Sequence, residues 1–88
     1  MATKKKTALV SAADRQRIKA FGEKVAAARN RAGLSVYEVT GEDMPIKSRQ
    51  HWQDIENGKK NVNLTTIIKI ARSLKVKSED LLAGLDRI

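Results

Sequence analysis

The fold of this chain is decided by the stretch Ser48-Arg49-Gln50-His51-Trp52-Gln53-Asp54-Ile55-Glu56-Asn57-Gly58-Lys59-Lys60. Ser48 can accept a hydrogen bond from a free backbone N–H of a first helical turn. Asn57-Gly58 supplies the left-handed exit that ends a helix at low steric cost. The stretch therefore predicts one short capped helix of about nine residues.

The expected helix has two opposed faces. Spacing of i, i+3 and i+4 gives one face the residues Trp52, Ile55 and Glu56. The opposite face is polar and carries Arg49, Gln50, Gln53 and Asp54. A short helix does not need an arginine and two amides merely to stay soluble, so this polar face is the first candidate binding surface.

Length and composition bound the remaining possibilities. The 88 residues suffice for one small domain with one core. The chain has no cysteine and a single histidine, His51, so we expect neither a disulfide nor a metal site, and no cofactor or small-molecule ligand is evident. No apolar run approaches ~20 residues and the basic start lacks a signal-peptide hydrophobic stretch, so no membrane partner and a cytoplasmic location are expected.

The net charge is +8, and the excess of basic residues is concentrated in the N-terminal third. This balance favours a polyanionic partner, nucleic acid first and an anionic membrane second, although a basic surface can also serve solubility alone. Residues 1–10 are expected to form a flexible basic arm around Lys4, Lys5 and Lys6, and residues 11–88 the folded domain.

Helix signals recur through the whole of residues 11–88. Ser11 is an expected N-cap for a first helix that ends near Ala32-Gly33, and Ser35 with Glu38 forms a capping box for a short second helix that includes Thr40. After the Gly41–Lys47 break comes the helix described above. Asn63 and Ser78 are expected to cap a fourth and a fifth helix. In the fourth, the apolar stripe expected to lie in the core consists of Leu64, Ile67, Ile68, Ala71 and Leu74. No segment alternates like a strand, so the domain is predicted to be all-α.

Several separate pieces of sequence, in order and spacing, resemble the lambda-repressor-like, Cro/repressor-type helix-turn-helix proteins over about residues 18–85. These pieces are Phe21-Gly22-Glu23-Lys24-Val25 with Ala28-Arg29, Gly33-Leu34-Ser35, Ile55-Glu56-Asn57-Gly58-Lys59, and Ile67-Ile68-Lys69-Ile70-Ala71 through Leu74-Lys75-Val76 to Leu81-Leu82. The resemblance implies a compact four- to five-helix domain that binds double-stranded DNA.

The family docks its third helix in the major groove. Carried onto this chain, the resemblance implies that Arg49 and Gln50 read bases, since arginine pairs with guanine and glutamine with adenine. Gln53 and Asp54 form a second tier, in which Asp54 either accepts from a cytosine amino group or orients Gln50. The residues expected to contact the DNA backbone are Ser35, Tyr37, Ser48, Asn57, Lys59 and Lys60. The arm Lys4–Lys6 resembles a DNA-wrapping arm, with a solvated tail as the alternative.

The resemblance also implies a largely buried ion pair between Arg29 and Glu56, which explains an acid on the inner face of the third helix. Two features depart from the family pattern. The link between the second and third helices is about two residues longer than usual, with Thr40 where a small alanine is common. Val36 also stands where many members place a glutamine that supports the first base reader.

Three other conspicuous features of the sequence each allow two interpretations. Trp52 could stack on an unpaired base, but its inner position and the scarcity of aromatics favour a core residue. His51 could sense pH or contact a phosphate, but a boundary residue is the simpler interpretation. The acids Glu38, Glu42 and Asp43 lack a nucleophile or histidine partner, which favours a solvated turn over a catalytic or metal cluster.

We therefore expect a homodimeric, sequence-specific regulator, a repressor rather than an activator, that binds a near-palindromic operator and is not an enzyme. The expected dimer surface is the apolar tail Leu82, Leu85 and Ile88. The competing hypothesis is an antitoxin-type or assembly protein that binds another protein and uses DNA only for autoregulation.

Overall fold

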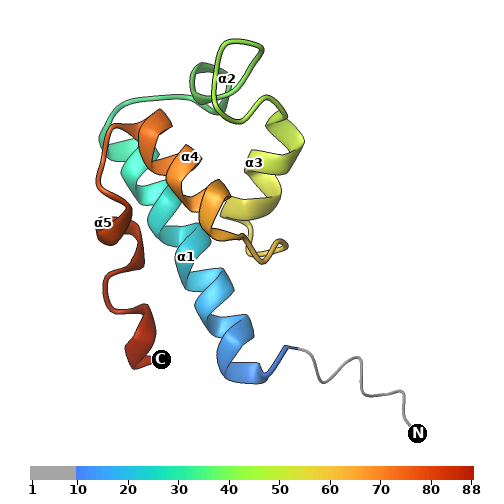
Figure 1. The fold of residues 1–88 in the computed structure, drawn as a ribbon, viewed down its shortest axis with the longest axis vertical. Coiled ribbons are helices and arrows are strands. Elements are labelled where there is room, and N and C mark those ends of the chain that lie inside the picture. Colours follow the sequence, from blue (N-terminus) through green and yellow to red (C-terminus); the bar gives the residue numbers. More distant parts are fainter. Residues whose placement is uncertain (1–9) are drawn as a thin grey trace, which may run out of the picture.

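The computed structural model describes residues 10–88, so Lys4, Lys5 and Lys6 of the expected arm lie outside the described residues. Residues 10–88 form five α-helices and a final 3-10 turn without any β-strand (Figure 1). The elements are α1 (Ala12–Arg31), α2 (Val36–Val39), α3 (Arg49–Glu56), α4 (Leu64–Leu74), α5 (Ser78–Leu82) and the 3-10 turn η2 (Leu85–Arg87). The prediction of an all-α domain is confirmed.

The first four helices begin at the capping residues that the sequence predicts. Ser11 accepts a hydrogen bond from the backbone N–H of Asp14 at 3.0 Å, and Ser48 accepts one from that of His51 at 3.1 Å. At α4 the Asn63 side chain accepts from the backbone N–H of Thr66. Each cap satisfies an N–H that the helix itself leaves without a partner.

A full capping box starts α2. The Ser35 hydroxyl accepts from the backbone N–H of Glu38 at 3.1 Å, and the Glu38 carboxylate accepts from the backbone N–H of Ser35 at 2.7 Å. Thr40 lies just outside the helix rather than within it, because its extended backbone ends the helix after Val39. Its buried hydroxyl donates to the carbonyl of Val36 at 2.7 Å, so the departure from alanine leaves no unpaired polar group here.

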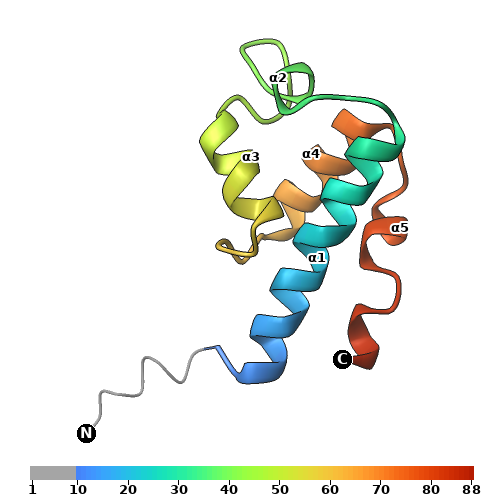
Figure 2. The same cartoon turned by 180° about the vertical axis from the view of Figure 1, so that it is seen from behind.

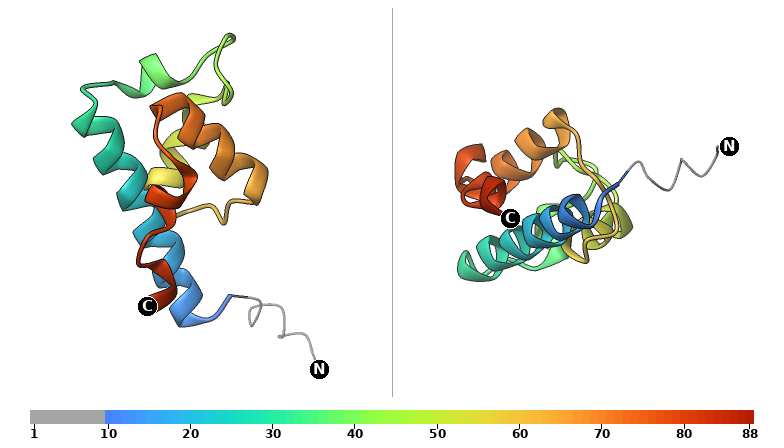
Figure 3. Two further views of the ribbon diagram at one scale, coloured as in Figure 1. Left: turned by 60° about the vertical axis from the view of Figure 1, so that its left-hand side comes forward. Right: turned by 90° about the horizontal axis from the view of Figure 1, so that it is seen from below.

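Helix α1 is the support on which the other elements pack. It contacts α3, α4, α5 and η2, and the C-terminal segment returns alongside its lower half (Figures 1 and 2). Seen from below, α4 and α5 lie together on one side of α1 (Figure 3). Side chains from every α-helix meet in one core, whose fully buried members are Val25, Val39, Trp52, Ile55 and Ile70, with Leu81 at 2 % exposure.

Two expectations about α4 and α5 were wrong. The fourth helix does not bury its whole apolar stripe, because Leu64 is 70 % exposed and Ile68 is 41 % exposed. The buried face is rotated toward Ile70, Ala71 and Leu74. Helix α5 is capped from Lys77 without a side-chain hydrogen bond, and Ser78 is its first helical residue rather than its cap.

Candidate nucleic-acid interface

Helix α3 is eight residues long and is held by an apolar underside. Trp52 and Ile55 have exposed fractions of 0 % and 1 %, so both side chains lie in the core. Burial of this extent is worth roughly 1.5–3 kcal/mol for an isoleucine-sized side chain. Trp52 is therefore a core residue and is not available as a stacking platform.

A glycine lets α3 approach α1 at backbone distance. A Cβ at Gly22 would lie 2.6 Å from the carbonyl oxygen of Glu56 and closer still to that of Ile55. Backbone atoms cannot step aside as a flexible side chain would, so only glycine fits at this contact. Gly22 belongs to one of the pieces that resemble the family, but the sequence does not predict its contact with the end of α3.

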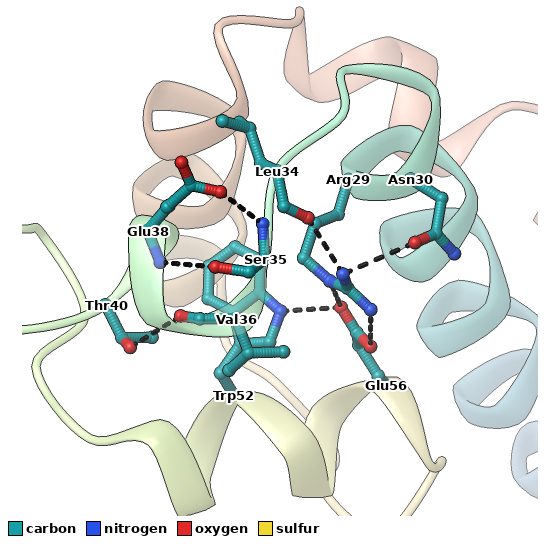
Figure 4. Close-up of polar contacts among 9 residues, drawn as sticks. All are labelled: Arg29, Asn30, Leu34, Ser35, Val36, Glu38, Thr40, Trp52 and Glu56. Carbon is teal, nitrogen blue, oxygen red and sulfur yellow. Dashed lines mark hydrogen bonds and ion pairs between the residues drawn. The ribbon is translucent and has the colours of Figure 1, made fainter.

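A polar network fixes the same end of α3 (Figure 4). The Arg29 guanidinium pairs with Glu56 through two hydrogen bonds, Nε to Oε2 at 2.7 Å and Nη2 to Oε1 at 3.0 Å. The side chains are only 15 % and 11 % exposed. Arg29 also donates to the carbonyl of Leu34 at 2.9 Å, and Trp52 Nε1 donates to Glu56 Oε2 at 2.6 Å. The network thus joins α1, the turn after it and α3.

The hydrogen bond to Glu56 raises the pKa of Arg29 above its ordinary value, while burial works against this increase. The guanidinium therefore carries its charge wherever the protein is folded. A paired, hydrogen-bonded charge of this kind can be tolerated in a half-buried position, whereas the removal of one partner would strand the other.

The outer face of α3 carries the four side chains that the sequence predicts to read bases. Arg49, Gln50 and Gln53 are exposed, and Asp54 is half-buried. Gln50 Nε2 donates to Asp54 Oδ1 at 2.8 Å, one turn along the helix. This hydrogen bond is the contact that the orienting role of Asp54 requires, and the contact with a cytosine amino group stays a prediction.

Arg49 has a neighbour that sequence reasoning missed. Its guanidinium carbon lies 4.1 Å from the centroid of the Tyr37 ring, which is a cation–π contact between α3 and α2. Tyr37 itself is 71 % exposed. The two residues are separated by the long link between the helices, and no sequence signal gives the path of that link.

The remaining residues predicted to contact the DNA backbone lie around α3 and are mostly exposed. Ser35 and Ser48 stand at the starts of α2 and α3, where their hydroxyl oxygens act as caps. Asn57, Lys59 and Lys60 follow the end of α3 and are exposed. The helix ends with backbone hydrogen bonds in which the N–H of Gly58 donates to the carbonyl of Ile55 and the N–H of Lys59 donates to the carbonyl of Asp54.

The long link between α2 and α3 is anchored rather than free. Ile46 is 5 % exposed and belongs to the core, while Lys47 Nζ donates to the carbonyl of Glu42 at 3.2 Å. Glu42 and Asp43 are exposed in this link, as a solvated turn requires. Within residues 10–88 no group of three acidic, histidine or cysteine side chains is arranged to hold a metal ion.

The apolar tail expected at a dimer interface is only partly available. Leu82 and Ile88 are 40 % and 39 % exposed, but Leu85 is half-buried and packs against the core. Gly84, at φ 82°, separates α5 from η2, so the tail is not one continuous helix. Arg17 holds it against α1 by donating to the carbonyls of Leu85 at 3.2 Å and Ile88 at 2.6 Å.

Comparisons with known proteins agree with this architecture. The profile of a helix-turn-helix family matches residues 25–81. Among solved structures, the restriction-modification controller protein C.AhdI from Aeromonas hydrophila is similar, with a TM-score of 0.65 and 26 % sequence identity over 73 % of this chain and 94 % of that one. No curated protein gives a significant match. In the part of the chain that the structure describes, no helix has the length and apolar content needed to cross a membrane.

Proposed function

The chain belongs to the helix-turn-helix family of lambda-repressor-like DNA-binding regulators, and from this premise we propose that it is a sequence-specific repressor. It binds double-stranded DNA as a homodimer on a near-palindromic operator and performs no catalysis. The solved neighbour is a controller protein by name, which supports regulation of transcription as the role.

The observation that carries the proposal is the division of α3 into two faces. Trp52, Ile55 and the Glu56 ion pair fix the inner face, while Arg49, Gln50 and Gln53 stand exposed on the outer one. A helix fixed in this way can enter the major groove, where bidentate contacts of arginine with guanine and of glutamine with adenine discriminate bases.

Exposed basic residues beside α3 support the same role. Lys59 and Lys60 follow the helix directly and are free to neutralise phosphates on one side of the groove. The net charge of +8 adds an attraction for DNA that does not depend on sequence. In this proposal phosphate contacts fix the register of the domain and α3 reads the bases.

A homodimer is proposed because one short helix reads too few base pairs for a unique site. A two-fold dimer places two recognition helices about 34 Å apart, one turn of DNA, and requires an inverted repeat. Exposed Leu82 and Ile88 offer an apolar surface for self-association, and Leu64 and Ile68 of α4 add to the exposed apolar area.

Selection of binding sites from a library of random duplexes tests the function directly. We expect enrichment of an inverted repeat whose half-sites each keep a fixed guanine for Arg49 or a fixed adenine for Gln50. The affinity for this repeat should fall steeply with salt. Recovery of random sequences only, together with co-purification of a stoichiometric protein partner, would favour the antitoxin-type alternative instead.

A further inference from the structure

We propose that Tyr37 is a positioning residue for Arg49, and that the base preference at the position read by Arg49 depends on the Tyr37 ring rather than on its hydroxyl group. This inference rests on the proposed function and deepens it. It replaces the phosphate contact expected for Tyr37 from the sequence with a different role.

The geometry that carries the inference is the stack between the two side chains. The guanidinium carbon of Arg49 lies 4.1 Å from the centroid of the Tyr37 ring. A guanidinium lying over a ring keeps its N–H groups at its edges, where they are free to form the bidentate pair with guanine. The stack thus holds the cation without using the donors that the base requires.

Both partners of the stack are attached to well-fixed helices. Val39 buries α2 in the core with an exposed fraction of 1 %, and the capping box of Ser35 and Glu38 fixes its first turn. Arg49 is the first residue of α3, whose start is capped by Ser48. The ring therefore extends from a well-fixed stretch of backbone, even though it is itself 71 % exposed.

An exposed arginine without a platform would lose more rotamer freedom on binding a base. The arginine side chain is long and has several rotatable bonds. The fraction of molecules in which the guanidinium already has its DNA-binding position therefore sets part of the affinity for DNA. Val36, the first residue of α2, is apolar and has no hydrogen-bonding group with which to orient Arg49. The neighbouring Tyr37 supplies this orientation through its ring instead.

Burial in the core does not explain the exposed tyrosine. An aromatic ring that leaves 71 % of its surface in water contributes little burial to the fold. A ring used only for folding would be placed in the core, as Trp52 and Phe21 are. The contact with Arg49 gives the ring a role at the surface where it lies.

The test compares Tyr37→Phe with Tyr37→Leu on the operator selected by the wild-type protein and on a random duplex at the same salt concentration. Tyr37→Phe keeps the ring and should keep the ratio of specific to random affinity. Tyr37→Leu should lower that ratio about two- to fivefold, the range of an exposed cation–π contact. Equal losses for both variants on both DNAs would assign Tyr37 to a phosphate and overturn the inference.

A double-mutant cycle shows whether the effect acts through Arg49. In the Arg49→Ala background, Tyr37→Leu should no longer change the ratio of affinities, because the group that the ring positions is absent. An unchanged effect of Tyr37→Leu in that background would also overturn the inference. Circular dichroism melts of all variants check that the domain remains folded.

A measurement without DNA separates this inference from the proposed function. In the free protein, the NMR signal of the Arg49 Nε–H should carry a ring-current shift in the wild type and in Tyr37→Phe, and should lose it in Tyr37→Leu. Absence of the shift in the wild type contradicts the stack whatever the DNA does. If the wild type shows the ring-current shift but the protein selects no DNA site, the proposed function is contradicted instead.

Discussion

Nε1 of Trp52 lies 2.6 Å from Oε2 of Glu56, and the same carboxylate is held by Arg29 from the neighbouring helix. Glu56 thus connects the largest core side chain to an ion pair. Glu56→Ala should destabilise the fold by about 3 kcal/mol or more, because it strands the Arg29 charge and leaves the indole N–H without its acceptor. Chemical denaturation followed by circular dichroism measures the loss. Glu42→Ala, in the exposed link, should stay within about 0.5 kcal/mol; similar midpoints for the two variants would contradict the prediction.

Gly22→Ala should destabilise the protein although alanine is the better helix former. Its Cβ would meet the carbonyl oxygens of Ile55 and Glu56, and α1 and α3 would have to separate. We expect the clash to lower the free energy of unfolding by about 2 kcal/mol or more. This loss outweighs the gain of about 1 kcal/mol from the higher helix propensity of alanine. The control is Glu23→Ala, an exposed neighbour on the same helix, which should change the stability little. A stabilised Gly22→Ala protein would show that the helices are not in backbone contact.

Lys75→Gly should stabilise the protein. Lys75 ends α4 with φ 59° and ψ 41°, a left-handed conformation that costs an L-residue about 1–2 kcal/mol and glycine almost nothing. Part of this gain is lost to the greater freedom of glycine in the unfolded chain, so we expect a net gain of about 0.5–1 kcal/mol. Lys69→Gly makes the same chemical change inside α4 and should have the opposite sign, at a cost of about 1 kcal/mol. Thermal melts of both variants measure the difference.

Arg49→Ala and Gln50→Ala should each cost roughly 1–3 kcal/mol on the selected operator and little on random DNA, because both side chains stand on the outer face of α3. Lys59→Ala and Lys60→Ala should weaken both kinds of DNA and reduce the salt slope by about one each. Fluorescence anisotropy titrations at several salt concentrations separate the two patterns. Uniform losses for all four variants would remove the distinction between base readers and phosphate contacts.

Leu82→Glu should impair self-association while the domain stays folded. Leu82 is 40 % exposed, whereas Leu85 is half-buried, so a charge at Leu82 disturbs the surface more than the core. Affinity for a full inverted repeat should fall far more than affinity for a half-site, and sedimentation should report a monomer. Ala27→Glu changes the net charge equally at an exposed position of α1 and serves as the control. Unaltered binding of the full repeat by Leu82→Glu would place the dimer contact elsewhere.

The starts of α1, α2, α3 and α4 could be predicted because a capping side chain acts within three residues of its own position. The start of α5 could not, since Ser78 has the same chemistry as a cap but lies one residue inside the helix. Exposure of Leu64 and Ile68 was missed for a different reason. Apolar spacing gives the width of a stripe but not which part of it meets the core.

The base-reading candidates could be placed on the exposed face of α3 from spacing alone. The stack of Arg49 on Tyr37 could not, because it depends on the path of the link through the buried Ile46. The approach of Gly22 to α3 was equally hidden, since a glycine within a helix gives no sign of what lies beside it. Contacts between elements that are distant in sequence thus required the structure.

Helix α3 is fixed against α1 at its C-terminal end, and the leading proposed base readers, Arg49 and Gln50, lie in its first turn. Gly22 and Glu56 fix its last turn against α1, and a Cβ at Gly58, the residue that ends the helix, would come within 3.0 Å of the Cα of Lys19. These close contacts oppose any tilt of α3 relative to α1. On the proposed operator, bending of the duplex would bring each half-site to a recognition helix that is held in this way, so flexible pyrimidine–purine steps between the half-sites should strengthen binding without touching the protein.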